Sequence, residues 1–200
     1  MTLSKWGYLF GTTLLIGTVV GLLLGIVLKM TVEGFVFEGV PIGPYEWVFI
    51  VLGASVVAVV SHAGLFAYLV LRFIGLSFLR KKFLWDIVQL ALVIVVFFDL
   101  IYLRYTSQEG EAISGITSFL WLPIVLFLCS LVIAYFKVKE TNRSAWVPTI
   151  FFLFVGTALE AVPAIRLEQP TFTFFTVTIL IVCNSWQIMK LHRLLNTKKS

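Results

Sequence analysis

Six long hydrophobic runs constrain the fold of this chain more than any other feature of its sequence. They cover residues 6–29, 47–72, 84–105, 119–136, 146–164 and 171–189. Crossing a hydrocarbon core about 30 Å thick takes roughly 20 mostly apolar residues in a helix, and most of the runs reach that length. The runs therefore predict an all-α, polytopic integral membrane protein. Its six transmembrane helices are expected to form one bundle, a single domain over residues 1–200.

The positive charges are distributed unevenly between the two sides of these runs. Twelve of the fifteen lysines and arginines fall on one side, namely Lys5, Arg72, Arg80, Lys81, Lys82, Lys137, Lys139, Arg143, Lys190, Arg193, Lys198 and Lys199. The opposite gaps hold Lys29, Arg104 and Arg166. Because basic residues accumulate in cytoplasmic loops, this pattern predicts a multi-pass protein of the cell membrane with both termini in the cytoplasm.

The tryptophans give an independent check on the ends of the predicted spans. Indole rings prefer the headgroup level, where the ring is buried and its N–H stays hydrated. Five tryptophans lie near the start of a run and one near the end of the last, in the order Trp6, Trp47, Trp85, Trp121, Trp146 and Trp186. Their positions agree with the assignment of the runs.

Composition narrows the class of partner. Hydrophobic residues make up 60% of the chain and charged residues 12%, which is typical of membrane proteins. The net charge of +5 does not indicate nucleic-acid binding, because the basic residues cap helix ends instead of lining a groove. We expect the lipid bilayer as a partner. The basic cluster at residues 80–82 is expected to bind anionic lipid with a favourable free energy of about 1 kcal/mol per charge. Cys129 and Cys183 fall within spans, so no disulfide framework is expected.

A glycine repeat in the first run is the strongest packing motif. Gly17, Gly21 and Gly25 recur every four residues, which places them on one face of a helix. Small residues at this spacing form a groove that allows another helix to approach closely. Two interpretations remain open from the sequence. The groove receives a helix of the same chain, or it docks another membrane protein or a second copy in a homo-oligomer.

The segment between the first two runs is unusually apolar for a loop. It reads TVEGFVFEGVPIGPY at residues 31–45, with Phe35 and Phe37 followed by Pro41 and Pro44. A solvated loop does not need this much apolar surface. One interpretation is a lid that packs on the helix ends at the membrane interface. The other is a contact surface for a partner.

Two carboxylates inside the runs are candidates for function. Asp99 and Glu160 each lie fourteen residues past a tryptophan, Trp85 and Trp146, so we expect them at a similar depth. Each costs at least about 2.5–3.5 kcal/mol at a helix centre on insertion scales. Three interpretations compete: ion pairs that fix helix register, pairing with a basic or polar side chain of a partner, and a proton or cation site shared by both carboxylates.

A second polar group is predicted toward the inner half of the spans. It comprises Ser61, His62, Gln89, Asn184 and Gln187, which are expected to hydrogen-bond across helices. One histidine cannot form a bis-histidine haem site, and no cysteine or carboxylate lies at ligand spacing from His62. Neither histidine is followed by glutamate, as a His-Glu-x-x-His metalloprotease requires. We therefore predict no catalytic residue, no metal site, no cofactor and no enzymatic activity.

The overall pattern resembles the KbaA family of KinB-signalling pathway activation proteins from spore-forming Gram-positive bacteria. About 200 residues, six spans, almost no soluble part, the opening stretch WGYLFGTTLLIG at residues 6–17 and the apolar first loop carry the resemblance. It implies a membrane protein that promotes signalling through a sporulation sensor histidine kinase, itself a multi-span protein, and so feeds a phosphorelay. It supplies no catalytic residues.

Two functions follow as hypotheses. The first is a non-enzymatic regulator that activates a sensor histidine kinase through helix and loop contacts in the membrane. The alternative is a small ion- or proton-coupled transporter that uses Asp99 and Glu160. The two hypotheses differ in what substitution of these carboxylates removes: a complex with a partner in the first case, a flux in the second.

Overall fold

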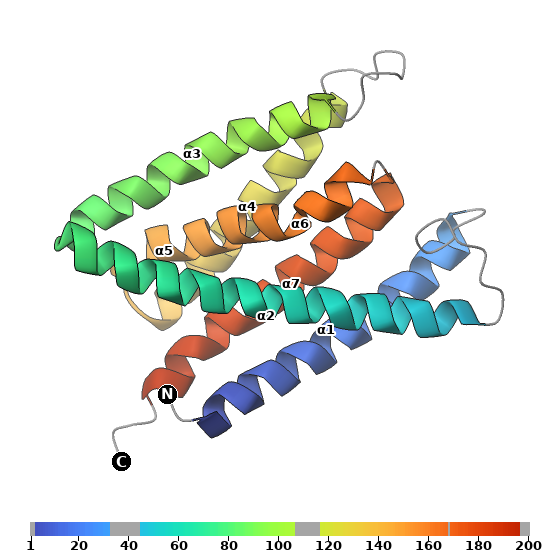
Figure 1. Ribbon diagram of the computed structural model, residues 1–200, viewed down its shortest axis with the longest axis horizontal. Helices are drawn as coiled ribbons and strands as arrows, with labels where there is room; N and C mark the ends of the chain where they lie inside the picture. The colour runs from blue at the N-terminus through green and yellow to red at the C-terminus, as the bar shows by residue number, and fades with distance from the viewer. Residues whose placement is uncertain (1–2, 33–44, 107–116, 168, 197–200) are drawn as a thin grey trace. The chain divides into compact units, whose positions relative to one another are not determined.

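A computed structural model describes residues 3–32, 45–106, 117–167 and 169–196, which are almost entirely helical. Its elements are α1 (Leu3–Thr31), α2 (Glu46–Leu79), α3 (Lys82–Thr106), α4 (Thr117–Glu140), the 3-10 turn η3 (Arg143–Ala145), α5 (Trp146–Phe151), η4 (Phe152–Gly156), α6 (Thr157–Arg166) and α7 (Pro170–Asn196) (Figure 1). Six helical segments within the described ranges are long and apolar enough to cross a membrane. The predicted all-helical class and the six membrane-length helices are confirmed.

Several helices continue beyond their predicted ends. The second extends to Leu79 instead of residue 72, because the residues after Arg72 are mostly apolar and include no proline. The residue after Leu79, Arg80, has a φ of 55°, the left-handed conformation that commonly follows the end of a helix. The last helix continues to Asn196, past the predicted end at residue 189. A charged residue ends an apolar run, whereas the hydrogen-bonded helix continues past it.

The fifth predicted span is not a uniform α-helix. It begins as α5, passes through the π-helical segment η4 and continues as α6. A π-helix has i→i+5 hydrogen bonds, is rare, and occurs often at functional sites. The hydrophobic run predicted the span at residues 146–164 but gave no sign of this change in winding.

The described chain divides into two compact units. Unit 1 contains Met1–Ala63 and Pro163–Ser200, and unit 2 contains Gly64–Val162. Helices α2 and α6 each contribute residues to both units. The predicted single bundle of six helices stays a prediction.

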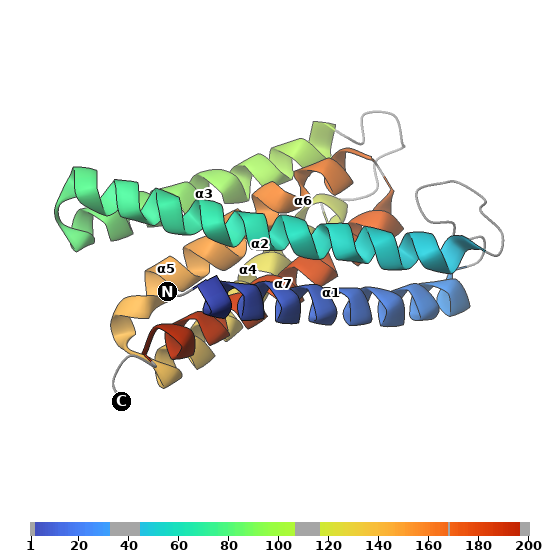
Figure 2. The ribbon, with the colours of Figure 1, turned by 60° about the horizontal axis from the view of Figure 1, so that its bottom comes forward.

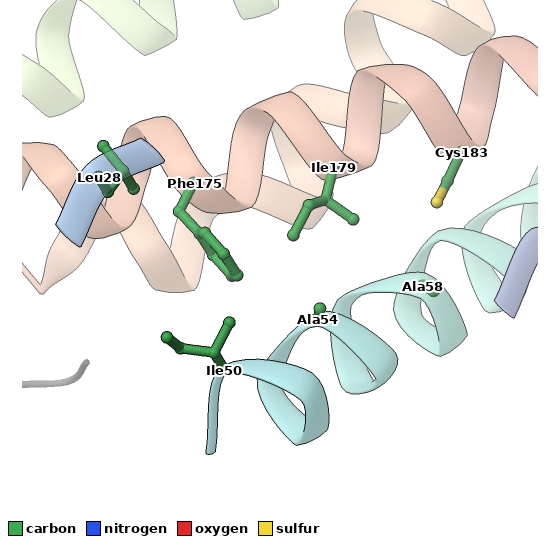
Figure 3. Close-up of a cluster of buried hydrophobic side chains, with 7 residues drawn as sticks. All are labelled: Leu28, Ile50, Ala54, Ala58, Phe175, Ile179 and Cys183. Atoms are coloured by element: carbon green, nitrogen blue, oxygen red, sulfur yellow. The ribbon is translucent and has the colours of Figure 1, made fainter. Parts of the chain in front are cut away.

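Unit 1 is built on the close packing of α1, α2 and α7. Figure 1 and Figure 2 show α1 (blue) beside α7 (red), with the start of α1 near the end of α7. There the Lys5 ammonium donates a hydrogen bond to the Leu194 carbonyl at 2.7 Å. The hydrophobic core comprises Leu28, Ile50, Ala54, Ala58, Phe175, Ile179 and Cys183 (Figure 3).

Unit 2 has an aromatic core shared by three elements. The rings of Phe97 from α3, Phe127 from α4 and Phe154 from η4 form a closed triangle. Their centroids lie 5.6 to 6.1 Å apart, with Phe97 stacked on Phe154 and Phe127 edge-on to both. Because Phe154 is fully buried, the π-helical segment lies at the centre of this unit.

Candidate functional site

The glycine face of α1 is occupied by other helices of the same chain. Gly17, Gly21 and Gly25 are buried, and each is matched by a small or branched residue of α2. A Cβ on Gly17 would lie 2.6 Å from the Ala58 Cβ, and one on Gly25 would lie 2.7 Å from the Ile50 Cγ2. These distances are too short for a methyl group. The groove is therefore filled from within unit 1.

The middle glycine is the tightest of the three. A Cβ on Gly21 would overlap the Ala54 side chain of α2 and lie 3.1 Å from the Ile179 Cδ1 of α7. Figure 3 shows Ala54 on α2 facing Ile179 on α7. By contrast, a Cβ on Gly7 or Gly11, in the same helix, meets no atom within 4 Å. The close approach is confined to the face of the four-residue repeat.

Three buried polar side chains join α2 to α7 in unit 1. The Ser61 hydroxyl donates to the Asn184 Oδ1 at 2.7 Å, and the Gln187 Nε2 donates to the Ser61 Oγ at 3.1 Å. All three side chains are fully buried. The structure thus brings together three of the five residues that the sequence grouped as an inner polar set.

His62 has an aromatic environment in unit 1. Its ring meets the edges of Trp6 and Phe10, with centroids 6.0 and 5.1 Å away. Its Nδ1 is buried and makes no hydrogen bond within the described residues. In these parts of the chain no three His, Cys, Asp or Glu side chains lie close enough together to hold a metal ion.

An ion pair joins the end of α1 to the start of α2 in unit 1. The Lys29 ammonium contacts the Glu46 carboxylate and lies 5.0 Å from the centroid of the Trp47 ring. The pair was not predicted, because the two residues lie seventeen positions apart on different helices. The four candidate contact residues of the connection, Phe35, Phe37, Pro41 and Pro44, lie outside the described residues.

Asp99 and Glu160, both in unit 2, have different environments. Asp99 is exposed on α3 and makes no hydrogen bond or ion pair within the described residues. Glu160 is half-buried on α6, with its Oε1 buried against α2. A Cβ on Gly64 would overlap this carboxylate.

A further polar cluster in unit 2 was not predicted as a group. The buried Tyr68 of α2 lies near Arg72 of the same helix and near Asp86 and Gln89 of α3. The Tyr68 ring packs on Phe152 of the π-helical segment, with centroids 5.1 Å apart. Of these four residues, only Gln89 was predicted as part of a polar group within the spans. The sequence does not show that Tyr68 and Arg72, which lie one turn apart on α2, are close to Asp86 and Gln89 on α3.

Trp85 belongs to the same turn of α3. Its indole ring covers Gly75 of α2, at a position where a Cβ would overlap the ring. The side chain is only 5% exposed, and its Nε1 is buried without a hydrogen bond in the described part of the chain. The Trp85 ring therefore packs α3 against α2. Its position near the end of a predicted span did not predict this contact.

Comparison with known proteins places these features in a family. The KbaA family model, described as KinB-signalling pathway activation in sporulation, matches residues 17–194. The KinB-signaling pathway activation protein of Bacillus subtilis (strain 168) is 29% identical over 186 residues, which cover 91% of this chain and 92% of that protein. No solved structure matches.

Proposed function

Because this chain belongs to the KbaA family, we propose that it is a membrane regulator that activates the KinB signalling pathway of sporulation. Its proposed partner is the sensor histidine kinase of that pathway, and the proposed action is non-enzymatic. Both termini are placed in the cytoplasm by the positive-inside rule. The proposed contact is made by helices and by residues 35–44, within or beside the cell membrane.

The extent of the family match is the observation that carries this proposal. It starts at Gly17 and ends at residue 194, so it runs from within the first membrane-length helix into the last. What this chain shares with the family is therefore the helical part itself, and the shared function is expected to depend on it. In unit 1 that part is held together by the closely packed glycine face and by the hydrogen bonds of Ser61.

The physical mechanism is a bias between two states of the kinase. A protein that binds the active state more tightly than the inactive state shifts the equilibrium by its differential affinity. A difference of about 1–3 kcal/mol corresponds to about a 5- to 150-fold change. Such a difference requires a rigid binding surface and no chemical step.

The transporter alternative has no support from the comparisons. It required Asp99 and Glu160 to act on one ion or proton. In the described structure Asp99 is exposed and the Oε1 of Glu160 is buried against α2. These different environments do not favour one ion or proton site shared by the two carboxylates.

A genetic experiment tests the pathway assignment. Sporulation and phosphate flow through the relay are measured with and without this chain, in cells driven by the KinB kinase and in matched cells driven by a different kinase. We expect loss of the chain to lower the output in the first strain and to leave the second unchanged. An equal loss in both strains would contradict a role specific to KinB.

A biochemical experiment tests direct action. The kinase is reconstituted into vesicles alone, with this chain, or with an unrelated six-span protein at the same ratio, and its autophosphorylation rate is measured. Direct activation predicts that the autophosphorylation rate rises about 5-fold or more when this chain is present, and does not rise with the unrelated protein. An unchanged rate, in vesicles where both proteins are inserted, would reject direct contact.

A further inference from the structure

Asp99 is a carboxylate on an apolar, exposed face of α3. The large side chains one turn before it, next to it and one turn after it are Val95, Phe98 and Tyr102, which are 60%, 65% and 66% exposed. Residues three and four positions apart share a helix face, so Val95 and Tyr102 flank Asp99 along the helix. Together the four residues are called the Asp99 face.

The location of Asp99 within a membrane-length helix makes this exposure costly. It lies fourteen residues beyond Trp85, about 21 Å along the helix axis. An ionised side chain at the centre of a membrane helix costs at least about 2.5–3.5 kcal/mol on insertion scales, and such residues are expected to pair with an opposite charge. Within the described residues Asp99 has no hydrogen bond or ion pair. A basic side chain of another protein, at the same depth, would pair this charge.

We infer that the Asp99 face binds a membrane helix of the pathway's sensor kinase through a lysine or arginine at the depth of Asp99. This inference rests on the proposed function and names the surface that performs it. A carboxylate and a basic group attract each other strongly at low dielectric, and the surrounding apolar side chains exclude water from the pair. The pair therefore supplies specificity, and the apolar side chains supply packing area.

A second copy of this chain is a poorer occupant of the same surface. A two-fold interface places the same patch of both subunits in contact. Centred on Asp99, it would bring two carboxylates together, and close like charges are unfavourable. A heterologous partner with a basic side chain meets no such penalty.

Substitutions at Asp99 distinguish this binding role from a structural role. Asp99→Leu removes a charge from a lipid-facing position and is expected to make the isolated protein more stable. The inference predicts that the same variant lowers KinB-dependent output at least 5-fold at unchanged protein level. Asp99→Glu keeps the charge and is expected to retain the output. If Asp99 had only a structural role, the more stable Asp99→Leu variant would keep or raise the KinB-dependent output.

Charge reversal tests the pairing directly. Asp99→Lys should abolish the output, and changing the facing lysine or arginine of the kinase helix to glutamate should restore it in this variant alone. Photo-crosslinkers at Phe98 and Tyr102 should join the kinase. Photo-crosslinkers at Leu15 and Leu23, which are exposed on α1, serve as a matched control. They should not form crosslinks to the kinase.

The outcomes separate the inference from the proposed function. Full signalling by Asp99→Leu, or crosslinks from Phe98 that join only two copies of this chain, would overturn the inference while the chain still activates KinB signalling. If the unsubstituted chain itself fails to change KinB-dependent output, the proposed function is wrong, whatever Asp99 does.

Discussion

At Gly21 a single methyl group determines how closely α1 can approach α2. A Cβ at this position overlaps the Ala54 side chain and lies 3.1 Å from Ile179. Overpacking of this kind typically costs about 1–3 kcal/mol, which exceeds the gain of about 1 kcal/mol that alanine brings to a helix over glycine. We therefore predict that Gly21→Ala lowers the free energy of unfolding, measured by SDS titration in mixed micelles, and lowers signalling with it.

Gly11 on the same helix provides the matched control. A Cβ there meets nothing within 4 Å, so Gly11→Ala should leave stability unchanged or raise it by up to about 1 kcal/mol. Equal unfolding free energies for the two variants would show that α1 does not pack on α2 through this face.

The effects of substitutions at Gly64 and Glu160 on the free energy of unfolding should not be additive. A Cβ on Gly64 occupies the position of the Glu160 carboxylate, which would have to move within a buried environment. We predict that Gly64→Ala destabilises the protein with Glu160 present and has little effect with Glu160→Ala. In a double-mutant cycle the coupling should fall in the range of about 0.5–3 kcal/mol that contacting residues show. Additive energies would contradict the contact.

At the scale of elements, the Ser61 hydroxyl links α2 to α7 through hydrogen bonds. It bonds Asn184 and Gln187 in a fully buried site, so Ser61→Ala removes one hydrogen bond from each of the two amides. Interhelical hydrogen bonds in membranes average about 0.6 kcal/mol and reach about 1.7 kcal/mol. We predict a loss of stability in this range, measured by the same unfolding titration.

Ser77 is the control for this element-scale prediction. It lies on the same helix, but its hydroxyl is exposed and bonds the Phe73 carbonyl one turn earlier. Ser77→Ala should therefore change stability by less than Ser61→Ala. A larger effect at Ser77 would show that the link between α2 and α7 contributes nothing measurable.

For the whole molecule, the distribution of charge predicts a sidedness that labelling can test. With both termini in the cytoplasm, epitope tags at either end should become accessible to antibody only after the membrane is permeabilised. In unit 1 the start of α1 and the end of α7 lie together, joined by the bond from Lys5 to Leu194, so the two tags should behave alike. A tag that is accessible in intact cells would reverse the predicted orientation.

The candidate site could be predicted only in part, because its members are joined by contacts distant in sequence. Ser61 and Asn184 are 123 residues apart, and polarity within a span identified both without showing that they meet. Asp99 and Glu160 shared a predicted depth, but depth does not specify which side of a helix faces inward. No polar cluster was predicted at Tyr68 and Arg72, because an aromatic ring and a charge near a span end are ordinary features of membrane helices.

The sequence by itself determined that the chain is helical and has six membrane-length segments. Length and hydropathy suffice for this, because each helix forms its hydrogen bonds locally. Only the tertiary structure decided that Gly21 faces Ala54, that Glu160 is packed against Gly64, and that residues 152–156 wind as a π-helix. These features depend on which side chains of distant helices meet. Hydropathy measures the affinity of a segment for lipid and is insensitive to its rotation about its own axis.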